Sequence, residues 1–511
     1  MVIPENKISA RISTKTDADL LILTITDDNN NPSLMNEFLY LQIAEKLQQQ
    51  IEKQVLKTGD KLPSVRALSK EQGISLTTAY QAYGELETKG LIEARPKSGY
   101  YVRFSPSQYP RTVSRQKTTK PQQVSVASVA TLVYQKMRQE GVTRLSLATP
   151  SVDLLPEAKL NKSMMEAIRR SASSCLEYED LQGHLQLREH IAKNAFSWGG
   201  ILTAEEIVTT QGCMEALVYC LKAVTEHGDS VAIESPVYFG ISNVLHSLGL
   251  KAVEIPVDPE TGVDITYLEK AMKTVAIKAC LFVTNFSNPS GANMPAERKK
   301  QLVELLHKKK IPLIEDDIYG EMYFGKTRPV TCKSFDTGGW VLLCSSISKA
   351  LAPGYRVGWC LPGRYLDKVL HLKLMSSVSS ATPTQAAIAH FFETGRYDLH
   401  MRNLRKTLHT QCLRYTQAIA SFFPSDTKIS RPAGGFVLWV ELNPAVDALE
   451  LFHEALTYGI SIAPGQLFSA HGKFRHHIRV SFGAPYTPLI EKSLKTLARL
   501  ITQKINKSQS R

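Results

Sequence analysis

The most informative segment for the fold is Ser346-Ile347-Ser348-Lys349-Ala350-Leu351-Ala352-Pro353-Gly354-Tyr355-Arg356-Val357-Gly358-Trp359. It follows an apolar run, 341–344, which has the continuous character of a buried parallel strand. Lys349 therefore stands just beyond a strand end, where open α/β sheets bind their ligands. The dense small residues and glycines around it speak against an ordinary surface lysine. Ser346 and Arg356 are candidate phosphate ligands, the arginine as a bidentate fork.

Similar apolar runs alternate with helical patterns over most of the chain. These runs are 207–210, 230–233, 279–283, 312–314 and 341–344. Each is followed by a Gly, Pro or Asp cluster and then by a helical pattern, which predicts βαβ units and a mostly parallel sheet. After about residue 384 the pattern becomes helical and returns to short strands at 435–441 and 478–482. That change predicts a small α+β lobe over about 385–505.

The turn after the first of these runs is a candidate phosphate site. A phosphorylated aldehyde cofactor needs a lysine to form an imine, donors for a phosphate dianion, a carboxylate for its ring nitrogen, and partners for its ring oxygen and face. The amides of Gly212, Cys213 and Met214 stand where a strand turns into a helix, and such amides can cradle phosphate. Taken alone this turn is a weak signal, because many strand-to-helix turns contain glycine.

Three later positions offer the remaining groups. Acids at 315–317 follow a predicted strand, and a carboxylate buried there needs a partner such as a pyridinium nitrogen. Adjacent acids also suit a metal or a helix cap, but no histidine stands beside them, so no metal site is predicted. Asn288 can donate to a ring oxygen, although its stretch equally suits a plain turn. Tyr238 offers an aromatic face to the ring.

The N-terminal part carries a different pattern. The predicted elements are helices at 38–55, 64–71 and 76–89 and strands at 91–95 and 99–102. The first helix follows from apolar residues at three- and four-residue steps. Pro63 opens the second helix and Gly73 ends it. Helix, helix, tight turn, helix and hairpin are the layout of a winged helix-turn-helix.

The start of the third helix is the predicted DNA-reading end. In a helix-turn-helix, side chains near this N-terminus reach base edges in the major groove. Hydroxyl groups there can also cap the helix and touch phosphates. The candidate DNA-binding residues are Arg66, Ser75, Thr77, Thr78, Tyr80, Lys97 and Ser98. The alternative is a small helical domain that contacts proteins, a role that winged helices also fill.

Length and composition limit the number of domains, the kind of partner and the location of the protein. A chain of 511 residues exceeds one compact core, and its net charge of +13 favours an anionic partner. The eight cysteines are scattered without CxxC spacing, which predicts reduced core residues rather than a disulfide framework or a zinc site. No apolar run approaches the ~18–20 residues of a membrane span, so a cytoplasmic location is expected.

These patterns predict four segments. They are a polar N-terminal extension at 1–36, a winged helix-turn-helix at 37–103, a basic flexible linker at 104–125 and a cofactor-binding body at 126–505. The linker is rich in Ser, Thr, Gln, Pro and basic residues, and the body begins with a helical stretch at 126–140.

The N-terminal motif resembles the GntR-type winged helix-turn-helix. The resemblance rests on Tyr40–Glu45, Gly59–Leu68, Thr77–Tyr80 and Leu86–Ile92, with a specific Leu-Pro-Ser-Val-Arg core at 62–66. It implies operator binding by a dimer.

Residues from about 140 to 500 resemble the fold-type-I aminotransferases. The motifs are Tyr178 through Gly183, the Gly212 turn, Tyr238, Asn288-Pro289, Asp316 with Tyr319, Ser346 through Lys349, and Arg479 ahead of 480–482. The resemblance implies pyridoxal 5′-phosphate as the cofactor, with Lys349 forming the internal aldimine. It also implies that Asp316, three residues before Tyr319 as in the family motif, pairs with the ring nitrogen.

The same resemblance assigns the remaining site residues. It implies that Asn288 and Tyr319 hold the ring oxygen and that Arg479 binds the α-carboxylate of an amino acid. Ser346, Ser348 and Arg356 fall in the cofactor-binding set. Tyr178 is implied to reach the phosphate of the other subunit's cofactor, so a homodimer is expected.

A GntR-type reader joined to such a body resembles the MocR group of regulators. Phrases at 213–217, 434–440 and 462–465 fit that group. Two functions stay compatible with the sequence. One is a DNA-binding transcription regulator whose body senses an amino compound or pyridoxal 5′-phosphate through the Lys349 aldimine. The other is a working aminotransferase acting on an amino acid and a 2-oxo acid. A scaffold protein would leave the cofactor motifs unexplained.

Overall fold

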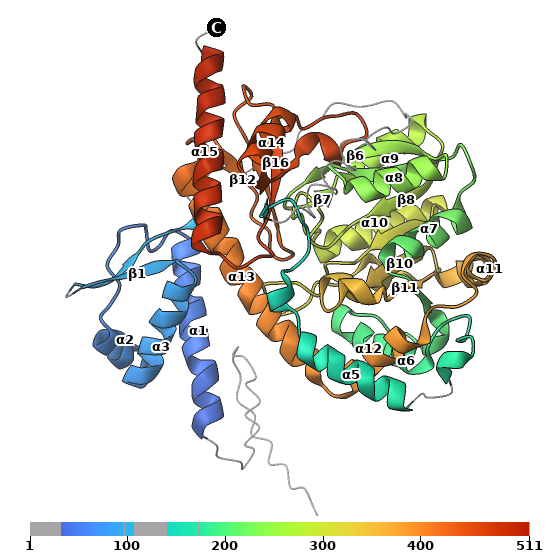
Figure 1. Ribbon diagram of the computed structural model, residues 1–511, viewed down its shortest axis with the longest axis horizontal. Coiled ribbons are helices and arrows are strands. Elements are labelled where there is room, and N and C mark those ends of the chain that lie inside the picture. Colours follow the sequence, from blue (N-terminus) through green and yellow to red (C-terminus); the bar gives the residue numbers. More distant parts are fainter. Residues whose placement is uncertain (1–31, 97, 107–140, 171–173, 510–511) are drawn as a thin grey trace, which may run out of the picture.

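The computed structural model describes residues 32–96, 98–106, 141–170 and 174–509. Figure 1 shows a small domain, here called the reader (residues 32–106), beside a large two-lobed body. Several predictions fall outside the described residues: most of the N-terminal extension, Lys97, the linker from residue 107 and the helical stretch at 126–140. In the part of the chain that is described, no helix is long and apolar enough to cross a membrane.

The reader has the predicted order of elements. They are α1 (Pro32–Glu52), α2 (Val65–Gln72), α3 (Leu76–Thr88), β1 (Ile92–Arg95) and β2 (Gly99–Val102). The Ser64 hydroxyl caps α2 by accepting the Ala67 N–H at 3.1 Å. Gly73 ends α2 in a left-handed conformation, with φ of 63°, which glycine adopts without strain. The predicted helix-turn-helix with a β-hairpin wing is therefore confirmed.

The reader extends slightly beyond its predicted end. Phe104 is buried in the reader's apolar core, and the buried Ser105 hydroxyl donates to the Ile51 carbonyl at 2.9 Å. The predicted linker started at residue 104, and this start is wrong by at least two residues. The linker composition did not reveal that an aromatic residue at its first position fills the core of the preceding domain.

The large lobe is organised around a mixed sheet of eight strands within the described residues. The order β4-β11-β10-β9-β8-β5-β6-β7 joins β4 (Val208–Thr210), β5 (Ser230–Ser235), β6 (Lys251–Asp258), β7 (Gly262–Val263), β8 (Ile277–Phe282), β9 (Leu313–Asp316), β10 (Val341–Ser346) and β11 (Gly358–Leu361). The central strands β10, β9, β8, β5 and β6 pair in parallel. The predicted α/β body with a mostly parallel sheet is confirmed.

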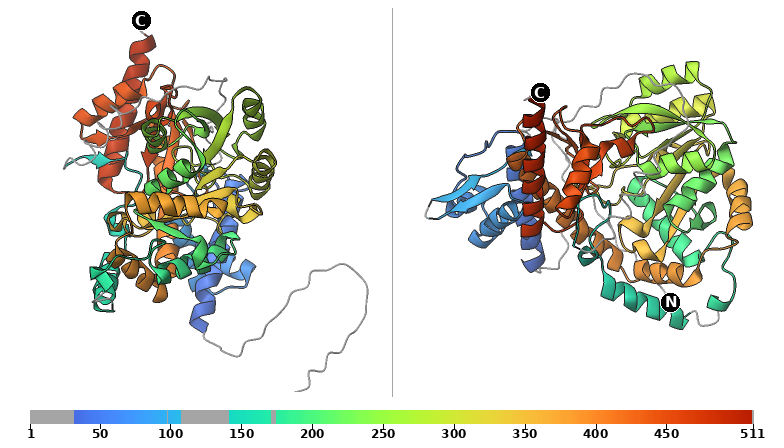
Figure 2. Two further views of the ribbon diagram at one scale, coloured as in Figure 1. Left: turned by 90° about the vertical axis from the view of Figure 1, so that its right-hand side faces the viewer. Right: turned by 45° about the horizontal axis from the view of Figure 1, so that its top comes forward.

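Helices cover both faces of this sheet (Figures 1 and 2). They are α5 (Glu157–Arg170), α6 (Leu185–Ala195), α7 (Cys213–Val224), α8 (Phe239–Ser247), α9 (Ile265–Thr274), α10 (Ala296–Lys309), α11 (Leu366–Ser376) and α12 (Thr382–Glu393). Successive residues of a strand point to opposite faces. Val231 and Ile233 of β5 accordingly join one apolar core, and Ala232 joins another.

The small lobe is α+β, as predicted. It contains α13 (Arg396–Phe422), β12 (Lys428–Ile429), β13 (Val437–Glu441), α14 (Ala448–Thr457), β14 (Ile460–Ser461), β15 (Ala463–Pro464), β16 (His477–Ser481) and α15 (Pro488–Gln509). Its described sheet has the order β12-β13-β16-β15. β14 pairs instead with β3 (Thr143–Arg144), at the start of the described body. The long helix α13 lies between the reader and the body (Figure 1).

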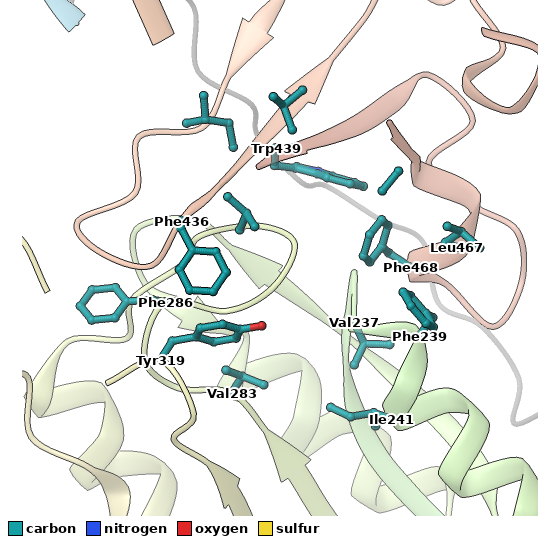
Figure 3. Packing of buried hydrophobic residues seen from close by; sticks show 14 of the residues in the cluster. Val237, Phe239, Ile241, Val283, Phe286, Tyr319, Phe436, Trp439, Leu467 and Phe468 are labelled. Atoms are coloured by element: carbon teal, nitrogen blue, oxygen red, sulfur yellow. The ribbon is translucent and has the colours of Figure 1, made fainter. Parts of the chain in front are cut away.

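Aromatic side chains join the two lobes. In Figure 3, Phe436, Trp439 and Phe468 of the small lobe face Phe239 and Tyr319 of the large lobe. The Phe436 ring meets the Tyr319 ring edge-on at a centroid distance of 5.5 Å. This apolar seam holds the lobes together beside the cavity described below.

Candidate functional site

A cavity of about 300 Å³ lies where the parallel strands of the large lobe end. The predicted site residues that line it are Cys213, Met214, Tyr238, Asn288, Asp316, Tyr319, Ser346, Ser348, Lys349, Arg356 and Arg479. Most follow the carboxyl ends of β4, β5, β8, β9 and β10, which meet at one edge of the sheet. Arg479 comes from β16 of the small lobe. The fold therefore collects residues that are up to 266 positions apart, as between Cys213 and Arg479.

Lys349 is the amine at the centre of this cavity. It ends a short 3₁₀ turn, Ile347–Lys349, directly after β10. Its Nζ donates to the Ala148 carbonyl at 2.8 Å. Burial, followed by the nearby Arg479 cation, lowers the pKa of Lys349 to about 8. A buried lysine with a lowered pKa supplies the neutral amine that reacts with an aldehyde.

Asp316 is the carboxylate of the site. It is the last residue of β9, and its Oδ1 accepts the Ile318 N–H at 3.2 Å and the Cys213 thiol at 3.4 Å. Burial raises the pKa of Asp316 to about 6. A carboxylate with so little solvation gains most from a cationic partner, such as a protonated ring nitrogen.

Asn288, Tyr319 and Arg479 form one hydrogen-bonded chain. The Asn288 amide donates to the Tyr319 hydroxyl at 3.1 Å, and Arg479 Nη1 donates to Asn288 Oδ1 at 2.9 Å. Arg479 Nη2 also donates to the Ser146 carbonyl. All three side chains are buried. Hydrogen bonds and packing thus hold in place two polar groups that suit a ring oxygen and one cation that suits a carboxylate.

The phosphate end of the cavity depends on glycine. Gly212 precedes α7 with φ of 86°, and a Cβ there would collide with the Arg356 guanidinium. A Cβ on Gly358 would lie 2.5 Å from the Gly212 carbonyl carbon. Arg356 Nη2 donates to the Gln211 carbonyl at 3.0 Å. These close approaches leave a cradle made by the first amides of α7, the Arg356 cation and the nearby serine hydroxyls, which suits a phosphate dianion.

Two predicted tyrosines lie in different surroundings. Tyr238 lines the cavity directly ahead of α8. Tyr178 does not line the cavity, and its side chain is 86% exposed. The structure therefore brings Tyr238 to the site and leaves Tyr178 on the surface of the chain.

The sequence interpretation missed one wall of the cavity. Ser146, Leu147, Ala148 and Thr149 line it, as do Phe239, Val283, Ile318 and Ala463. The 146–149 segment follows β3 without regular structure, so it has neither the period of a helix nor that of a strand. Its role rests largely on backbone groups, such as the Ala148 carbonyl, which side-chain identity does not reveal.

A polar network supports the site from behind. Asp317 accepts hydrogen bonds from the Asn285 amide at 2.8 Å and from Arg328 Nη2 at 2.5 Å. The buried Lys299 ammonium donates to Asn285 Oδ1 at 2.5 Å. Asp317 thus has cationic and amide partners of its own. Asp316, the neighbour that the sequence favoured, is the carboxylate that faces the cavity.

The start of α3 is the candidate DNA-binding face. Thr77 and Tyr80 are exposed, as are Arg66 on α2 and Ser98 on the wing. The Tyr80 side chain is 62% exposed, which is unusual for a large aromatic residue. The Ser98 hydroxyl shares a hydrogen bond of 2.7 Å with Tyr101. Arg95 lies 4.3 Å from the centroid of the Tyr101 ring, so the wing carries a further cation that sequence reasoning did not name.

Thr78 was predicted to contact DNA, and its position contradicts this. It is 2% exposed. Its N–H donates to Ser75 Oγ at 3.0 Å, and the two hydroxyls are 2.8 Å apart. Thr78 therefore fixes the cap of α3, together with Ser75, instead of facing a groove. A hydroxyl near a helix start serves equally for capping and for contact, and only burial separates these roles.

The donors of the cavity fit pyridoxal 5′-phosphate. A Cβ on Gly212 would collide with the Arg356 guanidinium at one end of the cavity, and the buried Asp316, a suitable partner for a cationic ring nitrogen, lines the same cavity. Lys349 has a lowered pKa and lies in the same cavity. These features define a fold-type-I body of the pyridoxal-phosphate class that carries a winged-helix reader.

Comparison with known proteins gives the family. Residues 140–494 match the model for aminotransferase class I and II, and residues 39–102 match that for bacterial regulatory proteins of the gntR family. The chain belongs to the class I and II aminotransferase family and, with its gntR-type reader, to the MocR-type group. Pyridoxal 5′-phosphate is the cofactor of this family, as predicted from the sequence.

Individual relatives match nearly the whole chain. The uncharacterized HTH-type transcriptional regulator YjiR of Escherichia coli is 37% identical over 462 residues, which cover 90% of this chain and 98% of the relative. YdcR of the same organism, with the same description, is 37% identical and covers 91% and 99%. The solved kynurenine aminotransferase of Pyrococcus horikoshii has a TM-score of 0.69 and 25% identity, covering 74% of this chain and 95% of that chain.

Proposed function

We propose that this protein is a DNA-binding transcription regulator whose body holds pyridoxal 5′-phosphate and responds to an amino compound or to the cofactor itself. The observation that carries the proposal is the presence of two kinds of candidate site in one chain. The reader presents an exposed, capped α3 start, and the body presents Lys349 in a preformed cavity. The descriptions of YjiR and YdcR as transcriptional regulators support it.

The chemistry of the body follows from its buried groups. Bound pyridoxal 5′-phosphate supplies an aldehyde that exchanges amino partners and a ring that accepts electrons. Lys349 Nζ loses its proton at about pH 8, well below the pKa of an ordinary lysine, because burial and the Arg479 cation disfavour the ammonium form. Asp316 holds negative charge beside the ring nitrogen position. Arg356 and the amides at the start of α7 bind the phosphate.

Arg479 defines the class of amino compound. Its guanidinium lies on the cavity wall, with Asn288 on one side and the Phe468 ring at 5.1 Å. A fixed guanidinium binds a carboxylate through paired hydrogen bonds. A compound that carries both an amine and a carboxylate can therefore place the amine at Lys349 and the carboxylate at Arg479.

A homodimer is part of the proposal. Leu176 and Tyr178 are 89% and 86% exposed, and Met375 on α11 is 66% exposed. Large apolar side chains left exposed in this way are typical of protein contact surfaces. Contact there between two copies would give Tyr178 a position in the partner's site.

Footprinting on DNA tests the regulator function. The purified full chain is incubated with the DNA upstream of its own gene, with and without pyridoxal 5′-phosphate and with a panel of amino acids and amines. Protection of a site with two half-sites is the expected result, because a dimer presents two readers. Failure to protect any site under all of these conditions would contradict the proposal.

Catalytic amino transfer is the second candidate function. The observation that favours it is the completeness of the half-reaction machinery, since Lys349 and Arg479 both line the cavity. The test supplies an amino acid and a 2-oxo acid in excess and measures amino transfer against Lys349→Ala. Turnover above this variant supports an enzyme. A ligand-induced change in the absorption of the cofactor without any transfer supports a sensor.

A further inference from the structure

The reader makes specific contacts with α13 of the body. Leu413 of α13 is 7% exposed and belongs to the reader's apolar core, with Ala420 packed against the same core. Leu404 and Leu408 of the same helix lie in the main core of the body instead. α13 therefore has two apolar faces, one for each domain. An amphipathic helix that served the body alone would need only one.

A buried charge also crosses this contact. Glu85 of α3 is 8% exposed, and a carboxylate so placed needs cationic partners. Lys89, one turn along the same helix, is 3.7 Å away, while Lys406 of α13 makes the shorter contact of 2.8 Å. Lys89 in turn donates to Gln48 of α1 at 3.0 Å. The body thus supplies the nearer of the two cations that contact the buried Glu85 carboxylate.

The DNA-reading end of α3 stays outside this contact. The contacting residues lie in the last turn of α3, whereas Thr77 and Tyr80 lie in its first turns and are exposed. A docked reader can still present its N-terminal face to DNA. Docking therefore fixes the direction of the DNA face relative to the body without blocking it.

The other end of α13 touches the segment that carries Lys349. The buried His400 donates through Nε2 to the Ala350 carbonyl at 2.7 Å, and Ala350 directly follows Lys349. Between the two ends, His409 stacks on Phe324 at a centroid distance of 4.9 Å. From His400 to Leu413 an α-helix spans about 20 Å. One rigid element thus contacts both the lysine segment and the reader.

We propose that α13 is the docking surface for the reader and that it ties the reader's position to the segment of Lys349. The docking itself does not depend on the proposed function, whereas its regulatory meaning rests on it. A change at Lys349 reaches the reader through His400 and α13. In a dimer the same change alters the spacing of two DNA faces.

Charge reversal in the full chain tests the docking. Lys406→Glu places a second carboxylate beside Glu85, and we expect amide hydrogen exchange in the last turn of α3 to become faster by about fivefold or more. Lys406→Arg keeps the cation beside Glu85 and is expected to keep exchange at the wild-type rate. Lys309→Glu, an exposed position on α10, is the control. Unchanged exchange in Lys406→Glu, or equally fast exchange in Lys406→Arg, overturns the docking.

The link to Lys349 needs a separate measurement. Exchange in the last turn of α3 is compared between cofactor-free protein and protein loaded with pyridoxal 5′-phosphate. We expect a difference in the wild type, its loss in His400→Phe, and its return in His400→Gln, which keeps a donor. The absorption of bound cofactor verifies that each variant is loaded. A wild-type difference that persists in His400→Phe overturns the link, whatever the outcome of the footprinting.

Discussion

The cofactor cavity and the DNA face of the reader are built by opposite means. In the cavity, Asp316 and Arg479 are 6% and 2% exposed, and each has hydrogen-bond partners inside the protein. On the DNA face, Thr77 and Tyr80 stand in solvent. Burial changes the chemistry of a group, so the cavity is prepared before its ligand arrives. The DNA face acquires its contacts only when the polyanion supplies them.

The largest expected effect comes from a substitution that abolishes covalent binding of the cofactor in the cavity. Lys349→Ala eliminates the amine that we propose as the carrier of the cofactor, and the absorption band of covalently held cofactor should disappear completely. The reader should still fold, because its apolar core does not include Lys349. Lys309→Ala serves as the control. A band that survives in Lys349→Ala would mean that another amine holds the cofactor.

The next effect breaks the phosphate cradle. In Gly212→Ala the new Cβ collides with the Arg356 guanidinium at a backbone φ of 86°. Displacing one charge-assisted contact costs about 1.5–3 kcal/mol, so cofactor affinity should fall by about ten- to a hundredfold. Gly354→Ala is the matched control, because nothing lies within 4 Å of its Cβ position. Equal affinities for the two variants, measured by titration of the absorption band, would remove Gly212 from the cradle.

A smaller effect concerns the DNA face. Tyr80→Ala should weaken binding to a footprinted site by about 1–3 kcal/mol if the side chain reads a base edge. Arg66→Ala should instead weaken binding to all sequences and reduce the slope of affinity against salt by ~1. Filter binding at several salt concentrations distinguishes the two. Both variants should retain full cofactor absorption. An unchanged affinity in Tyr80→Ala would exclude this exposed ring from base contact.

The smallest expected effect is a shift in the pH at which the rate of cofactor incorporation is half-maximal. Lys349 must be neutral to react, and its pKa lies at about 8, so cofactor incorporation should become faster as pH rises and level off above that value. Burial is the main cause of the lowered pKa and the Arg479 cation the next. Arg479→Gln removes that cation and should move the midpoint upward. Stopped-flow absorption measures it, and a downward move would contradict the assigned electrostatics.

The sequence predicted most of the cavity because most of its motifs lie at or just beyond the end of a strand. Asp316 and Lys349 stand at the ends of adjacent parallel strands, so the topology alone brings them to one edge. The 146–149 wall was missed because its segment has no periodic pattern and the Ala148 carbonyl acts through the backbone. Tyr178 is the reverse case. Its motif is clear in the sequence, but its side chain does not line the cavity of its own chain.

In the reader domain, too, local features could be predicted from the sequence and burial could not. The caps at Ser64 and Ser75 and the left-handed Gly73 are local features, and the sequence identified the elements that they bound. The burial of Thr78 and the packing of Phe104 depend on neighbours that are distant along the chain. A hydroxyl or an aromatic side chain occurs both on surfaces and in cores, so the residue type alone does not determine its role.

The order of elements, the two kinds of domain and the candidate reactive groups could be predicted from the sequence, because strand runs, helix caps and glycine turns are local properties of the chain. The burial of each group, the lowered pKa of Lys349 and the contact of α13 with both Ala350 and the reader became evident from the folded molecule alone. Desolvation and contact between distant segments are properties of the packed molecule, and they arise only when the chain has folded.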